Sequence, residues 1–427
     1  MKLLSILCCL GLLSACVPAN AAALAVPSAL NPTITTSPTR QKSATPIQAS
    51  ATPLPAATAT SQPTPLPPVA PQISAGEAHT CLLQADGGVR CWGWNAFGQT
   101  GSKPSQSTWP PAELPLEGIT QISAGAYHSC ALDFAGKVYC WGRNNQGQLG
   151  SGSQSDSYIP VQVTALSAEK ITSITSGSFH TCALNAAGQT WCWGSNMDGK
   201  LGAGSTSDME SQPAAVAGEH PAFINITAGG TFTCAAGADG SAWCWGDGSS
   251  GETGSKAKES SPLPVQVSGV ADVTSLSAGW EHVCVLTAAG NTACWGKNYA
   301  GELGNSSRLP RYLPAPVTGL SGKQPLRLLS AGGQTTCAVT TQNQLFCWGR
   351  NDAGQAGAAA RVDQLLPIQI TGISGDIQSL TVGGSHACAL TGSGQLYCWG
   401  ANDLNQLGAA AVVDSSTPVR LETPDGD

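Results

Sequence analysis

A pair of cysteines ten positions apart, with Trp-Gly after the second, occurs seven times along this chain. Successive second cysteines lie 49, 52, 52, 50, 53 and 51 residues apart. Self-similarity at about fifty residues is typical of propellers and solenoids, in which each repeat packs on its neighbours. The pairs are Cys81 and Cys91, Cys130 and Cys140, Cys182 and Cys192, Cys234 and Cys244, Cys284 and Cys294, Cys337 and Cys347, and Cys388 and Cys398.

The two cysteines of each repeat flank a predicted turn. Around the second pair, the β-prone runs 129–132 and 138–141 are separated by a stretch that includes Gly136, which is a hairpin signal. If Cys130 faces Cys140, their Cα atoms lie about 4.5–5.5 Å apart, a separation that suits a disulfide. Zinc ligands lie closer in sequence, as in Cys-x2-Cys. We therefore expect seven disulfides, each within one repeat.

Two further β-prone runs lie upstream of each hairpin. One opens at a proline, as in YIPVQVTAL at 158–166, and the other resembles ITSITSG at 171–177. Four short strands per repeat predict an all-β, seven-bladed β-propeller over residues 69–427, because radial closure protects strand edges. The first repeat lacks the proline-led run, and the chain nears its end with TPVRL at 417–421. We therefore expect this C-terminal strand to complete the first blade.

The N-terminus has the pattern of an export signal. An apolar run at 3–13 is too short to span a bilayer, and LSAC at 13–16 resembles the lipobox of bacterial lipoproteins. This pattern predicts a lipoprotein signal peptide at 1–15 and lipid on Cys16. An ordinary secretory signal, cut a few residues later, is the alternative.

Residues 16–68 are rich in Pro, Thr and Ala, as in TPLPAATATSQPTPLPPV at 52–69. Such a segment buries too little apolar surface to offset its ordering entropy, so we expect a disordered tether. Together with the lipid anchor, it predicts a cell-envelope protein on the extracytoplasmic face of a membrane. Paired cysteines in an exported chain are expected to form disulfides.

The repeat AGxxHxCAL…GxxYCWGxNxxGQLG resembles that of the regulator of chromosome condensation family of seven-bladed propellers, over residues 70–423. The namesake member of that family is a nucleotide exchange factor that docks on chromatin, and a secreted β-lactamase inhibitory propeller is the nearest kind of exported analogue. The net charge is −7, 11% of residues are charged, and no Lys/Arg cluster is present. These features argue against a nucleic-acid partner.

Histidines stand two residues before the first cysteine in five repeats, where Phe232 and Thr335 occupy the other two slots. A ring of histidines could hold a metal, but the interruptions favour a structural role, and we assign no metal or other cofactor. GQLG is not a phosphate loop, because no lysine follows it and no helix is expected there. The histidines are His79, His128, His180, His282 and His386.

Positions that differ between repeats are better candidates for binding, because loops on a rigid scaffold can vary without disturbing the core. The sequence favours a surface-tethered binding module that presents one propeller face to a protein or glycan. A propeller enzyme, a lyase or hydrolase, is the alternative, followed by an exchange factor; no catalytic residue is assigned. The candidates are Tyr127, Phe179, Trp280 and Glu281 within GxxH, and Trp94, Phe97 and Tyr299 around WGxNxxG, where Arg143, Lys297 and Arg350 also vary.

Overall fold

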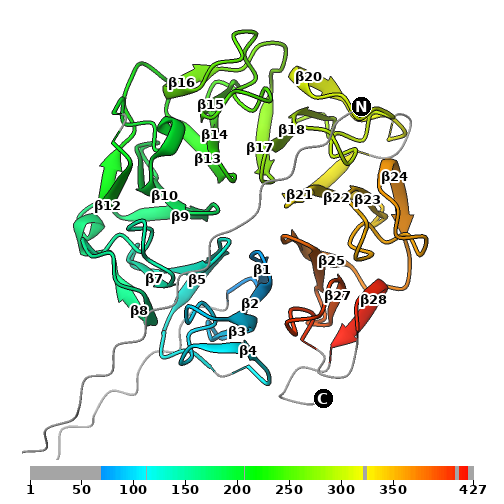
Figure 1. Ribbon diagram of the computed structural model, residues 1–427, viewed down its shortest axis with the longest axis horizontal. Helices are drawn as coiled ribbons and strands as arrows, with labels where there is room; N and C mark the ends of the chain where they lie inside the picture. The colour runs from blue at the N-terminus through cyan, green and yellow to red at the C-terminus, as the bar shows by residue number, and fades with distance from the viewer. Residues whose placement is uncertain (1–68, 112, 206, 321–324, 409–412, 422–427) are drawn as a thin grey trace, which may run out of the picture. The chain divides into compact units, whose positions relative to one another are not determined.

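The computed structural model describes residues 69–111, 113–205, 207–320, 325–408 and 413–421. Over these ranges, seven four-stranded antiparallel sheets surround a central axis (Figure 1). Each sheet is one blade made from four strands that are consecutive in the chain. The predicted all-β, seven-bladed propeller is therefore confirmed. The predicted signal peptide, the tether at 16–68 and Cys16 lie outside the described residues.

The blades are numbered in chain order. Blades 1 to 3 contain β1 (Gln72–Ala75), β2 (His79–Leu83), β3 (Val89–Asn95) and β4 (Ser105–Thr108); β5 (Ile119–Ala124), β6 (His128–Asp133), β7 (Val138–Gly142) and β8 (Ser157–Gln162); and β9 (Ile171–Ser176), β10 (His180–Asn185), β11 (Thr190–Ser195) and β12 (Met209–Ala215). Blades 4 and 5 contain β13 (Phe223–Ala228), β14 (Phe232–Gly237), β15 (Ala242–Gly246) and β16 (Ser261–Gln266); and β17 (Val273–Ala278), β18 (His282–Thr287), β19 (Thr292–Gly296) and β20 (Arg311–Pro316). Blades 6 and 7 contain β21 (Leu326–Gly332), β22 (Thr335–Thr340), β23 (Leu345–Gly349) and β24 (Gln364–Ile370); and β25 (Ile377–Val382), β26 (His386–Thr391), β27 (Leu396–Gly400) and β28 (Ser415–Leu421). Two short 3-10 helices are η1 (Thr164–Leu166) and η2 (Met197–Gly199).

All seven predicted disulfides form, each between the second and third strands of one blade. In blade 2, Cys130 of β6 directly faces Cys140 of β7, with the Cα atoms 4.1 Å apart. Asp133 closes the hairpin, since its carboxylate accepts the backbone N–H groups of Ala135 and Lys137 at 2.9 and 2.8 Å. Gly136 follows with a φ of +83°, a conformation that favours glycine. The turn chemistry therefore fixes the register that opposes the two cysteines.

The prediction that the proline-led strand opens each repeat is wrong. β8 contains this run and pairs with β7 of blade 2, with Val161 opposite Cys140, so the strand closes its blade from the outside. A proline suits this position because an edge strand does not need every N–H for pairing. The proline explains why the strand is an edge strand, but it does not specify which hairpin the strand joins.

The predicted completion of the first blade by the C-terminal strand is wrong for the same reason. β28 pairs with β27 in blade 7, with Val419 opposite Cys398, and blade 1 has its own outer strand, β4. Blades 7 and 1 instead meet through packed side chains and through hydrogen bonds, one of which runs from the backbone N–H of Gly384 to the carbonyl of Gly76 at 3.0 Å. Leu390 and Leu396 of blade 7 pack in one buried cluster with Trp92 of blade 1.

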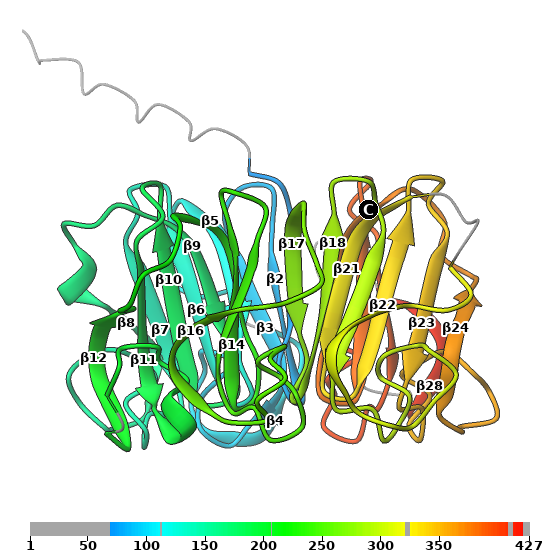
Figure 2. The ribbon, with the colours of Figure 1, turned by 90° about the horizontal axis from the view of Figure 1, so that it is seen from above.

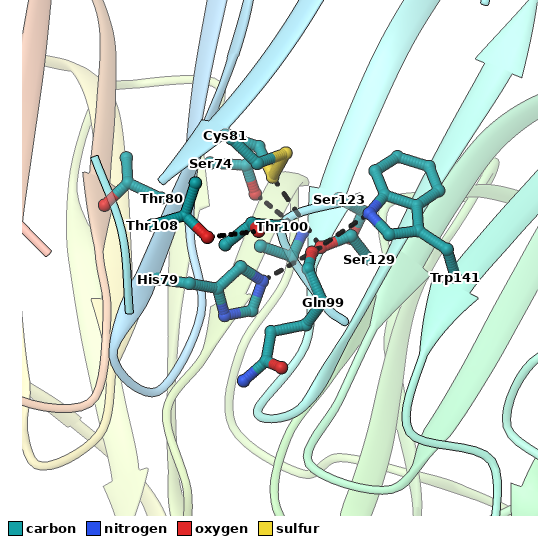
Figure 3. Close-up of a disulfide and its surroundings, with 12 residues drawn as sticks. Ser74, His79, Thr80, Cys81, Gln99, Thr100, Thr108, Ser123, Ser129 and Trp141 are labelled. Atoms are coloured by element: carbon teal, nitrogen blue, oxygen red, sulfur yellow. Dashed lines mark hydrogen bonds between the residues drawn. A yellow bond between two sulfur atoms is a disulfide. The ribbon is translucent and has the colours of Figure 1, made fainter. Parts of the chain in front are cut away.

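Adjacent blades are also joined by a repeated group of buried polar side chains. Between blades 1 and 2, His79 Nε2 lies 2.9 Å from Ser129 Oγ, and the Ser129 hydroxyl donates to the backbone carbonyl of Gln99 at 2.9 Å. The indole N–H of Trp141 donates to the same carbonyl at 2.9 Å. Figure 3 shows this group beside the disulfide of Cys81. We call it the interblade layer.

The same group recurs around the ring. The further histidine–hydroxyl pairs are His128 with Thr181, His180 with Thr233, His282 with Thr336, and His386 with Thr80, at 2.8 to 2.9 Å. Where Phe232 replaces the histidine, the hydroxyl slot of the next blade holds Val283, and where Thr335 replaces it, that slot holds Ala387. The interruptions of the histidine series are therefore matched by loss of the hydroxyl partner. The histidines have a structural role, although each partner lies in the neighbouring blade.

The asparagines of WGxN hold the loop that leads to the outer strand. Asn144 Oδ1 accepts the backbone N–H of Leu149 at 2.9 Å, and its Nδ2 donates to the carbonyls of Ser153 and Ser155 at 2.9 and 3.0 Å. One buried side chain thus ties both ends of the loop together. This support lets the exposed positions of the loop differ between blades.

Candidate functional site

Two sets of loops emerge on one side of the ring. In each blade, the loop between the first and second strands carries GxxH, and the loop between the third and fourth strands carries the residues after WGxN. Because the strands are antiparallel and run from one side of the ring to the other (Figure 2), both loops lie at the same end of the blade. We call this side the GxxH face. All seven candidate binding residues lie on it.

Four of the candidates form a continuous group of rings over blades 1 to 3. The ring centroid of Trp94 lies 5.7 Å from that of Phe97 and 5.4 Å from that of Tyr127, with near-perpendicular planes. Phe97 and Tyr127 lie 6.0 Å apart, and Tyr127 lies 5.2 Å from Phe179. Edge-to-face pairs at these distances stabilise each other beyond their shared burial. We call these four residues the aromatic cluster.

Arg143 of blade 2 lies against this group. Its guanidinium carbon lies 4.7, 5.4 and 5.5 Å from the ring centroids of Phe97, Tyr127 and Phe179. A guanidinium over aromatic faces is attracted by the ring quadrupoles. The aromatic cluster therefore already accommodates one cation, which the chain itself supplies.

The other candidates lie apart from the aromatic cluster. Glu281 forms an ion pair with Lys297, whose ammonium lies 5.4 Å from the ring centroid of Tyr299 on blade 5. Burial and this carboxylate act in opposite directions on Lys297, and its pKa is raised overall. Tyr299 is 58% exposed. These three residues are a second, smaller group on the same face.

Trp280 reaches the mouth of the central channel, a space of about 200 Å³ lined mainly by small residues of all seven blades. Trp280 is the second residue of the GxxH motif of blade 5, the position that Glu77 occupies in blade 1. Tyr127 is the third residue of the same motif in blade 2. Trp280 and Glu77 both line the channel, and Trp280 lies close enough to the Glu77 carboxyl to affect its pKa. Burial raises the pKa of Glu77 to about 7, while Arg350 and Trp280 act to lower it.

Sequence reasoning missed Glu77 and the hollow beside the aromatic cluster. The signal was present, since Glu77 is the one carboxylate in a slot that holds Ala126, Ser178 or Gly230 in other blades. The hollow, of about 580 Å³, opens on the GxxH face between blades 6, 7, 1 and 2. We call it the acidic hollow. It is lined by Glu77, Ala78, Trp94, Tyr127, Asp352, Ala353, Ser385, Ala401, Asp403, Leu404, Gln406 and Asp414.

The fold and its repeat define a class: a propeller of seven blades, each closed by a disulfide hairpin and joined to the next by a carbonyl of the GQLG loop. A family model described as RCC1-like domain matches residues 159–427. Models of the regulator of chromosome condensation (RCC1) repeat match residues 72–99, 86–132 and 119–148. The chain belongs to the RCC1-like domain family.

Curated relatives match part of the chain. The ultraviolet-B receptor UVR8 of Arabidopsis thaliana is 29% identical over 270 residues, which cover 62% of this chain and 61% of the receptor. The human E3 ubiquitin-protein ligase HERC2 is 26% identical over 257 residues, which cover 57% of this chain and 5% of the ligase. The chain thus spans less than two thirds of the length of either relative.

Solved structures share the fold. Human WBSCR16 superposes with a TM-score of 0.70 at 19% identity, covering 78% of this chain and 93% of that one. Yeast RCC1 (Prp20), crystallised with Kap60 bound, has a TM-score of 0.70 at 18% identity, covering 84% of this chain and 86% of that one. At these identities the likeness concerns the fold alone.

Proposed function

We propose that this protein is a binding module that presents its GxxH face to a protein partner and contacts that partner through the aromatic cluster. The carrying observation is the continuous group of Trp94, Phe97, Tyr127 and Phe179 on one face. Aromatic side chains are enriched among the residues that dominate protein interfaces. Their place on face loops, above a rigid ring, suits that role.

Packing of the propeller does not require these rings. The slot of Tyr127 and Phe179 holds Ala78, Thr231 and Ser385 in other blades, which have the same four-stranded structure. An aromatic side chain at this position therefore occurs only in blades 2 and 3. Yeast RCC1, which shares this fold, was crystallised with the protein Kap60 bound, and this supports a protein as the kind of partner.

The test compares two sides of the ring in the full-length protein. The triple variant Phe97→Ala, Tyr127→Ala and Phe179→Ala should lose capture of a partner from the exported proteins of the producing cell. Phe134→Ala is the matched control, since Phe134 is 63% exposed in a hairpin turn on the opposite side.

The expected result is loss of one captured protein by the triple variant, with a melting temperature within about 1–2 °C of the parent, a shift that corresponds to about 1 kcal/mol in a domain of roughly 350 residues. The control should capture that protein normally. Undiminished capture by the triple variant, or equal loss by the control, would exclude the aromatic cluster as the binding surface.

We further infer that residues 1–15 are a lipoprotein signal peptide, that Cys16 carries lipid, and that residues 16–68 tether the propeller, residues 69–427, outside the cytoplasm. Seven disulfides support this placement, because disulfides persist in oxidising compartments. Within the described ranges, helices are too short to cross a bilayer. Changing Cys16→Ala should release the protein from membranes or block its processing, as followed by fractionation. A membrane-bound variant of normal mature size would contradict the anchor.

A further inference from the structure

We propose that the acidic hollow receives a basic side chain, arginine or lysine, from the protein partner. This inference rests on the proposed function and names the chemistry of the partner at that site. The hollow adjoins the aromatic cluster, because Trp94 and Tyr127 belong to both. A partner seated on the cluster therefore places neighbouring residues at the hollow.

The charges in the hollow favour a cation. Its lining includes four carboxyl groups, those of Glu77, Asp352, Asp403 and Asp414, and no Lys, Arg or His side chain. Three of these carboxyl groups have cationic neighbours outside the lining. Arg350 pairs with Asp352 at 2.5 Å and also acts on Glu77, and Arg361 pairs with Asp414 at 3.1 Å.

Asp403 is different. Its carboxylate accepts a hydrogen bond from Gln406 Nε2 at 3.2 Å, and within the described ranges it forms no ion pair. It is exposed at the rim of the hollow. The hollow therefore retains negative charge after its internal pairs are formed, and that charge is accessible to a ligand.

The aromatic side of the hollow also suits a cation. Trp94 and Tyr127 line it, and the neighbouring rings show how this cluster accommodates a guanidinium: Arg143 lies 4.7 Å from the Phe97 centroid. An entering cation would meet both ring surfaces and carboxylates, because both line the hollow. Aromatic rings and carboxylates both attract cations, and arginine can use both at once because its planar group stacks and donates two parallel hydrogen bonds.

The hollow is large enough for such a group. Its volume of about 580 Å³ falls within the range of small-molecule sites, so a basic side chain can enter with its backbone. The carboxylates Glu77, Asp352 and Asp403 come from loops of blades 1, 6 and 7. The loops that carry Asp352 and Asp403 are held by the buried asparagines that precede these residues, Asn351 and Asn402, which accept backbone N–H groups at 2.9 Å. Such a preformed site loses little conformational entropy on binding.

The test uses the full-length protein and N-acetyl-arginine amide as the probe, followed by saturation-transfer NMR. N-acetyl-citrulline amide is the neutral probe of nearly the same shape. The protein variants are Asp403→Asn and, independently, Glu77→Gln. Asp208→Asn is the matched control, because Asp208 is an exposed carboxylate on blade 3 of the same face and does not line the hollow.

The arginine probe should bind the parent and Asp208→Asn equally, and the citrulline probe should bind neither. Asp403→Asn should weaken arginine binding roughly tenfold, as loss of a hydrogen bond to a charged group does, and Glu77→Gln should also weaken it. Equal binding of the two probes, or equal binding by all the variants, would overturn the proposal.

Failure here is distinguishable from failure of the proposed function. If the aromatic triple variant loses its protein partner while the arginine probe fails to bind the parent, the aromatic cluster is supported as the binding surface. The proposal that the hollow receives a basic side chain is then wrong. If the probe binds at the hollow while the triple variant still captures its partner, the hollow is supported as a site for a basic side chain. The proposal that the partner contacts the aromatic cluster is then wrong.

Discussion

The interblade layer and the loops of the GxxH face are built from the same repeat, yet they vary in different ways. In the layer, His128 and Thr181 are fully buried, and substitutions occur in matched pairs, such as Phe232 with Val283. On the face, Tyr127 and its equivalents change independently between blades. Residues that recur or change together hold the blades, whereas residues that vary freely are available for binding.

The largest expected difference between the two regions concerns tryptophans. Trp141→Ala should lower the free energy of unfolding by about 3–5 kcal/mol, because the side chain is fully buried and its indole joins two blades. Trp94→Ala on the face should cost about 1 kcal/mol or less. Urea unfolding of both variants measures this. Equal losses would mean that the face is part of the structural core.

The disulfide hairpins belong to the structural region. Replacing both Cys130 and Cys140 with alanine should lower the free energy of unfolding by about 3 kcal/mol, because the closed loop restricts the unfolded chain. Arginine-probe binding at the acidic hollow should remain, since blade 2 keeps its register through the Asp133 turn. Unchanged unfolding in urea would contradict the stabilising role of the bridge.

Acid should weaken the interblade layer. Burial lowers the pKa of His79, His128 and His282 to about 3 and that of His386 to about 4, and it places that of His180 well below its usual value. Each is depressed from 6.5, so stability is fully present above pH 6.5 and is lost as the pH falls toward 3–4. Burial raises the pKa of Glu77 and Glu252 to about 7 and also raises that of Glu302, so these groups stabilise the fold below pH 4.5 and lose that contribution as the pH rises.

Between pH 6.5 and pH 4.5, acidification removes the stability contributed by five neutral histidines and restores that contributed by three protonated carboxyls. Because the histidines are more numerous, the melting temperature should fall as the pH is lowered over this range. The variant His128→Phe with Thr181→Val copies the apolar pair of blades 4 and 5 and removes one histidine from this balance. Its melting temperature should therefore fall less steeply over the same range, as scanning calorimetry would record. Identical dependence of the melting temperature on pH in parent and variant would contradict the claim that the buried histidines cause the loss of stability in acid.

The sequence was sufficient for the fold because each cysteine pair fixes a hairpin register, and seven equal registers leave few architectures. It was not sufficient for strand order, since the proline-led run of β8 can pair with either neighbouring hairpin and local pattern does not choose. At the site, Tyr127 and Phe179 share a slot in adjacent blades, so their proximity followed from the repeat. The contacts with Trp94 and Phe97 did not, because these residues come from the other loop.

The central claim is that the aromatic cluster, and not another surface, contacts a protein. Site-specific photo-crosslinking in the producing cell tests it most directly, with a benzophenone amino acid placed at Phe179 on the GxxH face or at Phe134 on the opposite side. The account predicts a discrete crosslinked protein from position 179 and none from position 134. Adducts of equal yield at both positions, or an adduct from position 134 alone, would contradict it.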